Sequence, residues 1–314
     1  MFDNVDFDFD TILEEIETYA HLKGASYSEF IANATQEEKD ILKSVQYKNL
    51  SSKDYDYLES TKDKAAMIIN LRCFFGVESL SNIELSQKVA FRIARAKNIN
   101  PYALAAWLRK GEILAENLKV PIYNKSGLME ILPQLKNISY EMPKDFYEQT
   151  ADLLCEVGVG LVAVENPSNT AVNGAVRILD DKIILYVSTH RKRYDIFWFS
   201  LFHEIGHIIL HDIKNQEFIS LNCDEYNQST DKEEIEADNY ASNILINPTH
   251  FDMFLNKGDF SFSSVSKFSK LEGVHSSIVF GRLAKFGYVE YKYISKYLAN
   301  IFLQDGKIFA YDTK

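Results

Sequence analysis

Three histidines and one glutamate interrupt an apolar stretch of the chain. His203, His207 and His211 recur at intervals of four residues, and Glu204 directly follows the first of them. Side chains four residues apart lie on one face of a helix, one turn apart, so His203 and His207 can direct two imidazoles at one point. Glu204 lies one residue round the helix, where it can reach a ligand on a bound metal without binding the metal itself. This is the H-E-x-x-H pattern, which combines two zinc ligands with a general base.

A second acidic element follows and gives this pattern a partner. Glu234 and Asp238 are again four residues apart, at the start of a helical pattern that stops before Pro248. We expect Glu234 to supply the third metal ligand and Asp238 to orient a histidine by accepting its second N–H. The alternative is a solvated acidic helix start beside a helix with buried histidines. That alternative is disfavoured because burying His and Glu in an apolar helix is costly unless they are paired or bound.

The composition is that of an ordinary soluble globular protein. The chain has 314 residues, of which 46% are hydrophobic and 25% charged, enough for two domains and a sizeable core. No apolar run approaches the length of a membrane span, and the first residues are acidic, unlike a secretory signal. Cys73, Cys155 and Cys223 are far apart and odd in number, which fits reduced thiols and predicts a cytoplasmic location. Cys223 is better explained as a loop thiol than as a metal ligand.

The charge pattern argues against nucleic-acid binding by the chain as a whole. The formal net charge is -11, although residues 88–110 are basic. Two helical patterns, at 84–97 and 102–116, flank a break at Pro101 and permit a helix-turn-helix interpretation. An ordinary helical hairpin is far commoner, and basic residues on one helix are weak evidence for DNA binding. DNA binding is therefore disfavoured, without being excluded.

Hydrophobic periodicity predicts an α+β fold. Residues 1–140 are predicted to be a helical N-terminal region, which includes a capping box at Thr35 and a short helix at 125–132. Residues 141–314 are predicted to be a second domain. It begins with a helix from Pro143 to Val157, after which the hydrophobic period changes from that of a helix to that of strands.

The second domain is predicted to carry a small sheet and further helices. Three strands with turn residues between them are expected at 159–164, 174–179 and 183–188. We expect them to form a small antiparallel meander directly before the histidine helix, with an edge strand able to hold an extended peptide. A pair of helices is predicted at 262–271 and 276–286, and a last helix or two at 291–303.

Five segments from Phe74 onward together match a known family pattern. They lie at residues 74–77, 106–112, 195–207, 234–241 and 245–248. On these segments the chain resembles the ImmA/IrrE family of zinc metallo-endopeptidases. The resemblance implies a zincin-like peptidase domain in which His203, His207 and Glu234 bind Zn²⁺ and Glu204 is the base. It places His211, with Asp238, among the residues around the metal ligands or in the core.

The resemblance also implies a role for the protein. It suggests a regulatory protease of a bacterium or phage that cleaves or binds a repressor or an antitoxin. Many relatives carry an N-terminal helix-turn-helix, which we do not find before Phe74. The main alternative is a non-catalytic regulator that keeps the zinc fold and acts by binding protein or DNA.

Two further features of the site stay open at this point. A closed structural zinc site would need a fourth ligand, for which His211 or Cys223 would have to serve, and His/His/Glu sites also accept manganese and other ions. The mechanism needs an oxyanion donor besides the metal. Tyr194, His190 and Tyr240 are candidates by their proximity in the sequence.

Overall fold

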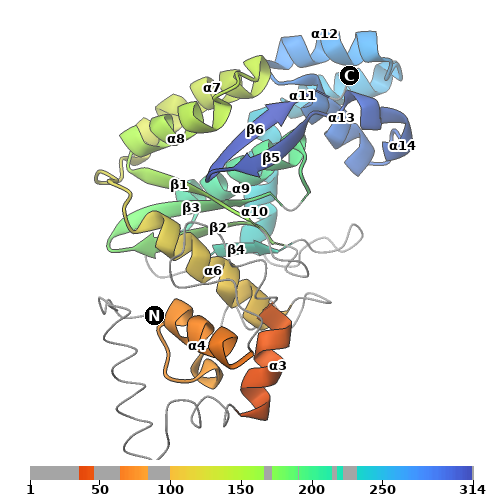
Figure 1. The fold of residues 1–314 in the computed structure, drawn as a ribbon. Coiled ribbons are helices and arrows are strands. Elements are labelled where there is room, and N and C mark those ends of the chain that lie inside the picture. The colour runs from red at the N-terminus through yellow and green to blue at the C-terminus, as the bar shows by residue number, and fades with distance from the viewer. Residues whose placement is uncertain are drawn as a thin grey trace, which may run out of the picture. The chain divides into compact units, whose positions relative to one another are not determined.

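The protein is described from a computed structural model (Figure 1). The described residues are 35–45, 64–83, 100–165, 172–189, 191–213, 218–221 and 232–312. The chain divides into two compact units, one ending at Lys110 and the other beginning at Gly111. The predicted boundary at residue 140 between a helical region and a peptidase-like domain stays a prediction.

The first unit is helical where it is described. It contains α3 (Gln36–Val45), α4 (Lys64–Phe75), the short 3₁₀ helix η2 (Leu80–Asn82) and the first part of α6 (Pro101–Ala115). The predicted capping box is confirmed: the Glu38 amide donates to Thr35 Oγ1 and the Thr35 amide donates to Glu38 Oε2, both at 3.2 Å. The helices predicted before Thr35 and at 84–97 lie outside the described residues.

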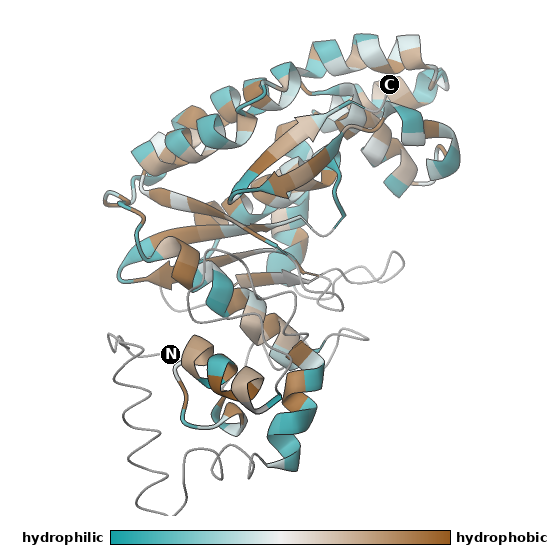
Figure 2. Ribbon diagram, viewed as in Figure 1, coloured by the Kyte–Doolittle hydropathy of each residue, from teal (hydrophilic) through white to brown (hydrophobic). Residues whose placement is uncertain are grey.

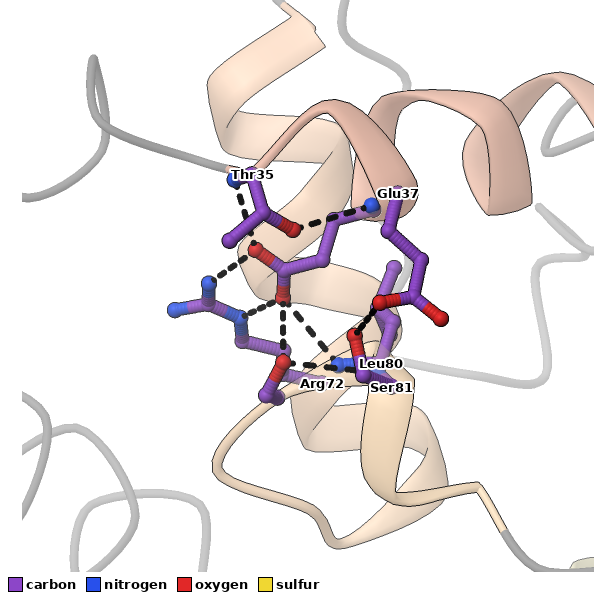
Figure 3. A network of polar contacts seen from close by, with 7 residues as sticks. Thr35, Glu37, Arg72, Leu80 and Ser81 are labelled. Atoms are coloured by element: carbon purple, nitrogen blue, oxygen red, sulfur yellow. Dashed lines mark hydrogen bonds and ion pairs between the residues drawn. The ribbon is translucent and has the colours of Figure 1, made fainter.

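Glu38 also connects the elements of this unit. Its carboxylate is buried and accepts hydrogen bonds from Arg72 Nε (2.9 Å) and Nη2 (2.7 Å) on α4. It accepts two more, from Ser79 Oγ and the Leu80 amide at the start of η2. Figure 3 shows this network from close by. A buried carboxylate with this many donors fixes the positions of α3, α4 and η2 relative to one another.

The second unit is built on a mixed sheet. Its strands are β1 (Val159–Val164), β2 (Val172–Leu179), β3 (Lys182–Ser188) and β4 (Phe218–Leu221), in the order β1-β3-β2-β4. The predicted β2–β3 hairpin is confirmed, with a tight turn at Asp180 and Asp181, whose φ angles are 49° and 61°. Figure 2 shows hydrophobic residues along these strands.

The position of β1 corrects the predicted antiparallel meander. β1 pairs in parallel with β3, with Val159 opposite Ile183, so it is not the neighbour of β2. All six residues of β1 are buried, and their continuous apolar run suits a strand covered on both faces better than a one-sided meander. The α+β fold class is confirmed, with a mixed sheet in place of an antiparallel one. β4 was not predicted.

The second unit also contains helices. They are α7 (Lys125–Glu141), α8 (Phe146–Glu156), α9 (Tyr194–Leu210), α10 (Lys232–Leu245), α11 (Pro248–Lys257), α12 (Phe262–Glu272), α13 (Ser276–Lys285) and the short α14 (Tyr291–Ile294) with its 3₁₀ extension η4 (Ser295–Tyr297). Of these helices, α8 and α9 pack against this sheet. None of the helices in the described parts of the chain is long and apolar enough to span a membrane.

Two helix predictions were wrong in extent. The helix predicted to end at 132 continues through Pro133 to Glu141. The carbonyl that Pro133 leaves without an N–H belongs to Met129, which is 53% exposed, so water can satisfy it. The helix predicted at 291–303 ends at Tyr297, and a hairpin of β5 (Asn300–Gln304) and β6 (Lys307–Tyr311) follows. Its turn contains Gly306 at φ 73°.

The core centres on α9, which packs against α10, β2 and α13. Rings of α8 and α9 form an aromatic cluster: Phe146 lies 5.3 Å from both Tyr194 and Phe197 between ring centroids and 6.2 Å from Trp198. The predicted helical pair is confirmed as α12 and α13, and α13 is buried over most of its length. α13 therefore covers part of the histidine helix, and α12 packs against α13.

Candidate metal centre

The histidine helix is buried on nearly every side. An apolar surface all round a helix predicts this, because each face must be removed from water. Its polar residues are buried with it: Glu204 and His207 are 0% exposed and His203 is 6% exposed. Polar side chains at this depth need partners, and α10 supplies carboxylates to both histidines.

His203, His207 and Glu234 converge. The Nε2 atoms of the two histidines lie 3.0 Å apart. Glu234 Oε2 lies 3.3 Å from His203 Nε2, and Glu234 Oε1 lies 3.5 Å from His207 Nε2. The structure thus brings together the three residues that the sequence proposed as metal ligands, from two helices, with ligand atoms all within 4.8 Å of one another.

These distances fit zinc. With zinc–ligand bonds of about 2.0–2.2 Å in a tetrahedron, neighbouring ligand atoms lie about 3.3–3.5 Å apart. The two Nε2 atoms lie 3.0 Å apart, and the two carboxylate oxygens of Glu234 lie 3.3 and 3.5 Å from one histidine each, which is close to these values. Two imidazole nitrogens and one carboxylate form one face of such a tetrahedron and leave its fourth corner to another ligand. The same donor set accepts other divalent ions, so the geometry defines the site and not the identity of the ion.

Residues 159–262 match the sequence model of the IrrE N-terminal-like domain, a peptidase family M78 domain. The match assigns similarity to the ImmA/IrrE metallopeptidase family to this part of the chain. The matched segment runs from β1 to the start of α12 and contains all three converging residues. No curated protein matches the chain.

The charged groups of the candidate site shift one another's pKa values. Burial lowers the pKa of His203, but hydrogen bonds with Asp238 and Glu234 outweigh burial and raise that pKa to about 10. Burial, together with the neighbouring charge of His203, lowers the pKa of His207 to about 4 despite the hydrogen bond with Glu234. Burial would raise the pKa of Glu234, but the two histidines hold it well below its usual range. The pKa values of the two histidines therefore shift in opposite directions, and a metal must displace any proton held on a ligating Nε2.

Each converging histidine has a partner at its other ring nitrogen. Asp238 Oδ1 lies 2.9 Å from His203 Nδ1, and His211 Nδ1 lies 3.0 Å from His207 Nδ1. Asp238 therefore lies where it can orient His203, as the sequence analysis expected, and His211 lies beside the metal ligand His207. Glu236, which was not predicted, lies with its Oε2 3.2 Å from His211 Nε2.

Phe218 on β4 is another residue that the sequence analysis missed. Its ring stacks on His207 at 4.4 Å between centroids and on His211 at 5.4 Å, with interplanar angles of 24° and 25°. One aromatic ring thus covers both imidazoles. Phe218 lies on the short strand β4, which pairs with β2, a strand far from it in the sequence. No residue spacing in the sequence indicates that Phe218 contacts the two histidines.

Gly174 on β2 brings the sheet backbone against Glu204. A Cβ atom at Gly174 would lie 2.6 Å from Glu204 Oε1 and 2.9 Å from Glu204 Cγ. Glycine inside a strand often marks such a close approach, so the sequence contained a signal that we did not use. The expected base is therefore held between its own helix and β2.

The candidate oxyanion donors have different surroundings. The Tyr194 hydroxyl donates to the carbonyls of Ile138 and Ser139 on α7, at 3.3 and 3.4 Å. As placed, it is directed at α7 and not at an oxyanion. Tyr240 lies against α9, where a Cβ at Gly206 would be 3.2 Å from its ring. His190 and Cys223, the latter considered as a fourth ligand, lie outside the described residues.

Proposed function

We propose that this chain is a zinc-dependent endopeptidase that cleaves a regulatory protein, either a repressor or an antitoxin. The observation that carries the proposal is the convergence of His203, His207 and Glu234 beside the fully buried Glu204, within a domain of a metallopeptidase family. The choice of a repressor or antitoxin as substrate rests on the family resemblance alone.

The residues divide the work of peptide hydrolysis between them. His203, His207 and Glu234 would hold zinc, which when bound supplies an activated water and polarises the peptide carbonyl. Glu204 accepts a proton from the attacking water and delivers it to the leaving amine nitrogen. Asp238 accepts the Nδ1–H of His203 and so keeps the Nε2 lone pair of this ring directed at the ion.

Exchanging Glu204 for glutamine tests the proposal. Glu204→Gln keeps the size of the side chain and leaves the three metal ligands in place, so zinc content by atomic absorption should equal that of the wild type. His203→Ala should lose the metal. Proteomics of cells expressing the wild type or Glu204→Gln should then reveal a protein fragment that depends on Glu204. Equal fragment patterns in the two cell lines, with zinc retained in both proteins, would contradict the proposed catalysis.

That contradicting result is the one expected of the alternative, a non-catalytic regulator that keeps the zinc fold and binds protein or DNA. In that case regulation would survive Glu204→Gln unchanged. A closed structural zinc site makes a different demand, because it needs a fourth protein ligand. Both ring nitrogens of His211 face other side chains, His207 and Glu236, so His211 as placed does not serve. The absorption spectrum of a cobalt-substituted protein separates an open, water-bearing site from a closed one.

A further inference from the structure

We propose that Glu236 and His211 are positioning residues that set the tautomer of His207. They form a directed chain of hydrogen bonds, from His207 through His211 to Glu236, that leaves the His207 Nε2 lone pair free for a metal. The inference rests on the proposed metal site and adds residues to it. Glu236 has no role in the function proposed above.

The chain starts from what His207 must do to bind a metal. Its Nε2 faces His203 Nε2 at 3.0 Å and Glu234 Oε1 at 3.5 Å, so this is the nitrogen directed at the ion. A neutral imidazole carries one N–H, and a ligating Nε2 must be the unprotonated nitrogen. The proton of His207 therefore belongs on Nδ1, and Nδ1–H needs an acceptor. The atom that faces it, at 3.0 Å, is His211 Nδ1.

An imidazole nitrogen is an acceptor only when its proton is on the other nitrogen. For His211 Nδ1 to accept, the proton of His211 must be on Nε2. Glu236 Oε2 lies 3.2 Å from that Nε2, and an ionised carboxylate only accepts hydrogen bonds. Glu236 at the end of the chain thus fixes His211, and His211 in turn fixes His207.

Burial makes this arrangement decisive. The side chain of His207 is 0% exposed and that of His211 is 6% exposed, so bulk water does not replace the acceptor between them. Phe218 stacks on both rings and restricts their rotation. His203 achieves the same result in one step, because Asp238 accepts directly from its Nδ1 at 2.9 Å. His207 lies one turn further along α9, and its Nδ1 is connected to the carboxylate of Glu236 through the imidazole of His211.

Paired substitutions in the full-length chain separate hydrogen bonding from packing. His211→Phe keeps a ring against Phe218 but removes the acceptor, whereas His211→Asn restores an acceptor oxygen near the position of Nδ1. Glu236→Leu removes the acceptor for His211, whereas Glu236→Gln keeps an acceptor oxygen. Glu233→Leu is the matched control, because it removes a carboxylate from the same turn of α10 outside the chain of hydrogen bonds.

Two measurements test the proposal. Zinc affinity of the metal-free proteins is measured by competition with a chromophoric chelator, and the tautomer of His207 is read from the ¹⁵N chemical shifts of its ring. We expect His211→Phe and Glu236→Leu to weaken zinc binding by about 10–100-fold, the loss typical when a partner of a ligating histidine is removed. The conservative variants and Glu233→Leu should remain close to the wild type. The His207 Nδ1–H tautomer should dominate in the wild type and be lost in His211→Phe.

Wild-type affinity in both His211→Phe and Glu236→Leu, or an unchanged His207 tautomer, would overturn the proposal and leave the zinc site itself intact. A wild-type protein that binds no zinc would overturn the proposed function as well. If His211→Phe does not fold, Glu236→Leu decides the question, because the Glu236 side chain is 41% exposed and its loss leaves the core packed.

Discussion

Replacing Gly174 by alanine should disable the expected base without disturbing the metal ligands. The three atoms nearest to an added Cβ all belong to Glu204, at 2.6 Å from Oε1, 2.9 Å from Cγ and 3.0 Å from Cδ. Non-bonded carbon atoms prefer separations of about 3.5–4.0 Å, so the Glu204 side chain must retreat by about 0.6 Å or more. Glu204 is fully buried on α9 and cannot swing into solvent.

A displacement of this size has a large catalytic cost. Since a misplacement of about 1 Å can cost about 100-fold, we expect kcat/KM to fall by about 10–100-fold. Overpacking should cost about 1–3 kcal/mol of stability, of which the preference of about 0.5–1 kcal/mol for alanine over glycine in a strand offsets a part. Zinc content should equal that of the wild type.

The assay is hydrolysis of the protein whose fragment depends on Glu204, followed together with zinc content and thermal unfolding. Gly160→Ala is the matched control: it makes the same change on β1 of the same sheet, where the new Cβ meets Ile184 Cδ1, the end of a flexible apolar side chain, at 2.7 Å. The control should cleave normally. Full activity in Gly174→Ala, with zinc bound, would refute the view that β2 positions Glu204.

Three other substitutions test the packing and hydrogen bonding of the helices in the two units. Burial would raise the pKa of Glu38, but hydrogen bonds from Arg72 and from the backbone outweigh burial and lower that pKa. The ionised carboxylate therefore stabilises α3 at neutral pH. This contribution to stability is lost as the pH falls through the lowered pKa. Hydrogen exchange of α3 should therefore depend less on pH, between about pH 6 and pH 3, in Glu38→Gln than in the wild type. Phe146→Ala removes a buried ring that contacts three aromatic rings of α9 and should cost about 3–5 kcal/mol in chemical denaturation. Gly281→Ala would push a methyl group into Asp195 where α13 meets α9, and should cost about 1–3 kcal/mol in thermal unfolding.

The ligand set could be predicted because it depends on local helix geometry. Residues four apart share a face, so His203 and His207 had to converge once α9 was a helix. Glu234 was within reach of prediction because the two histidines required a third ligand and a second helix carried a suitable carboxylate. Glu236 and Phe218 were not, since their contacts with His211 depend on how α10 and β4 pack against α9, which sequence spacing does not encode.

The errors in the fold have the same origin. A continuous apolar run such as β1 is compatible with either strand direction, and its pairing with β3 is a long-range choice. The predicted helix stops one residue before Pro133, although the hydrogen bond that this proline removes lies on the exposed side of α7. The β5–β6 hairpin is a different case, because the Asp-Gly pair at its turn, Asp305 and Gly306, is a strong local signal that we overlooked.

The burial of α13 also bears on what the pair of α12 and α13 contributes to function. A helix that reads DNA must present a face to the major groove, yet Ile278, Val279, Phe280 and Leu283 on α13 are all at most 4% exposed. Exposing each such side chain costs about 1.5–3 kcal/mol, whereas a good bidentate base contact returns about 1–3 kcal/mol. Releasing α13 from α9 would therefore cost more than base contacts return, and would remove support from the helix that carries both histidines. The packing therefore favours a role for α13 in holding α9 in place for Glu204 and the metal ligands over a role in reading DNA.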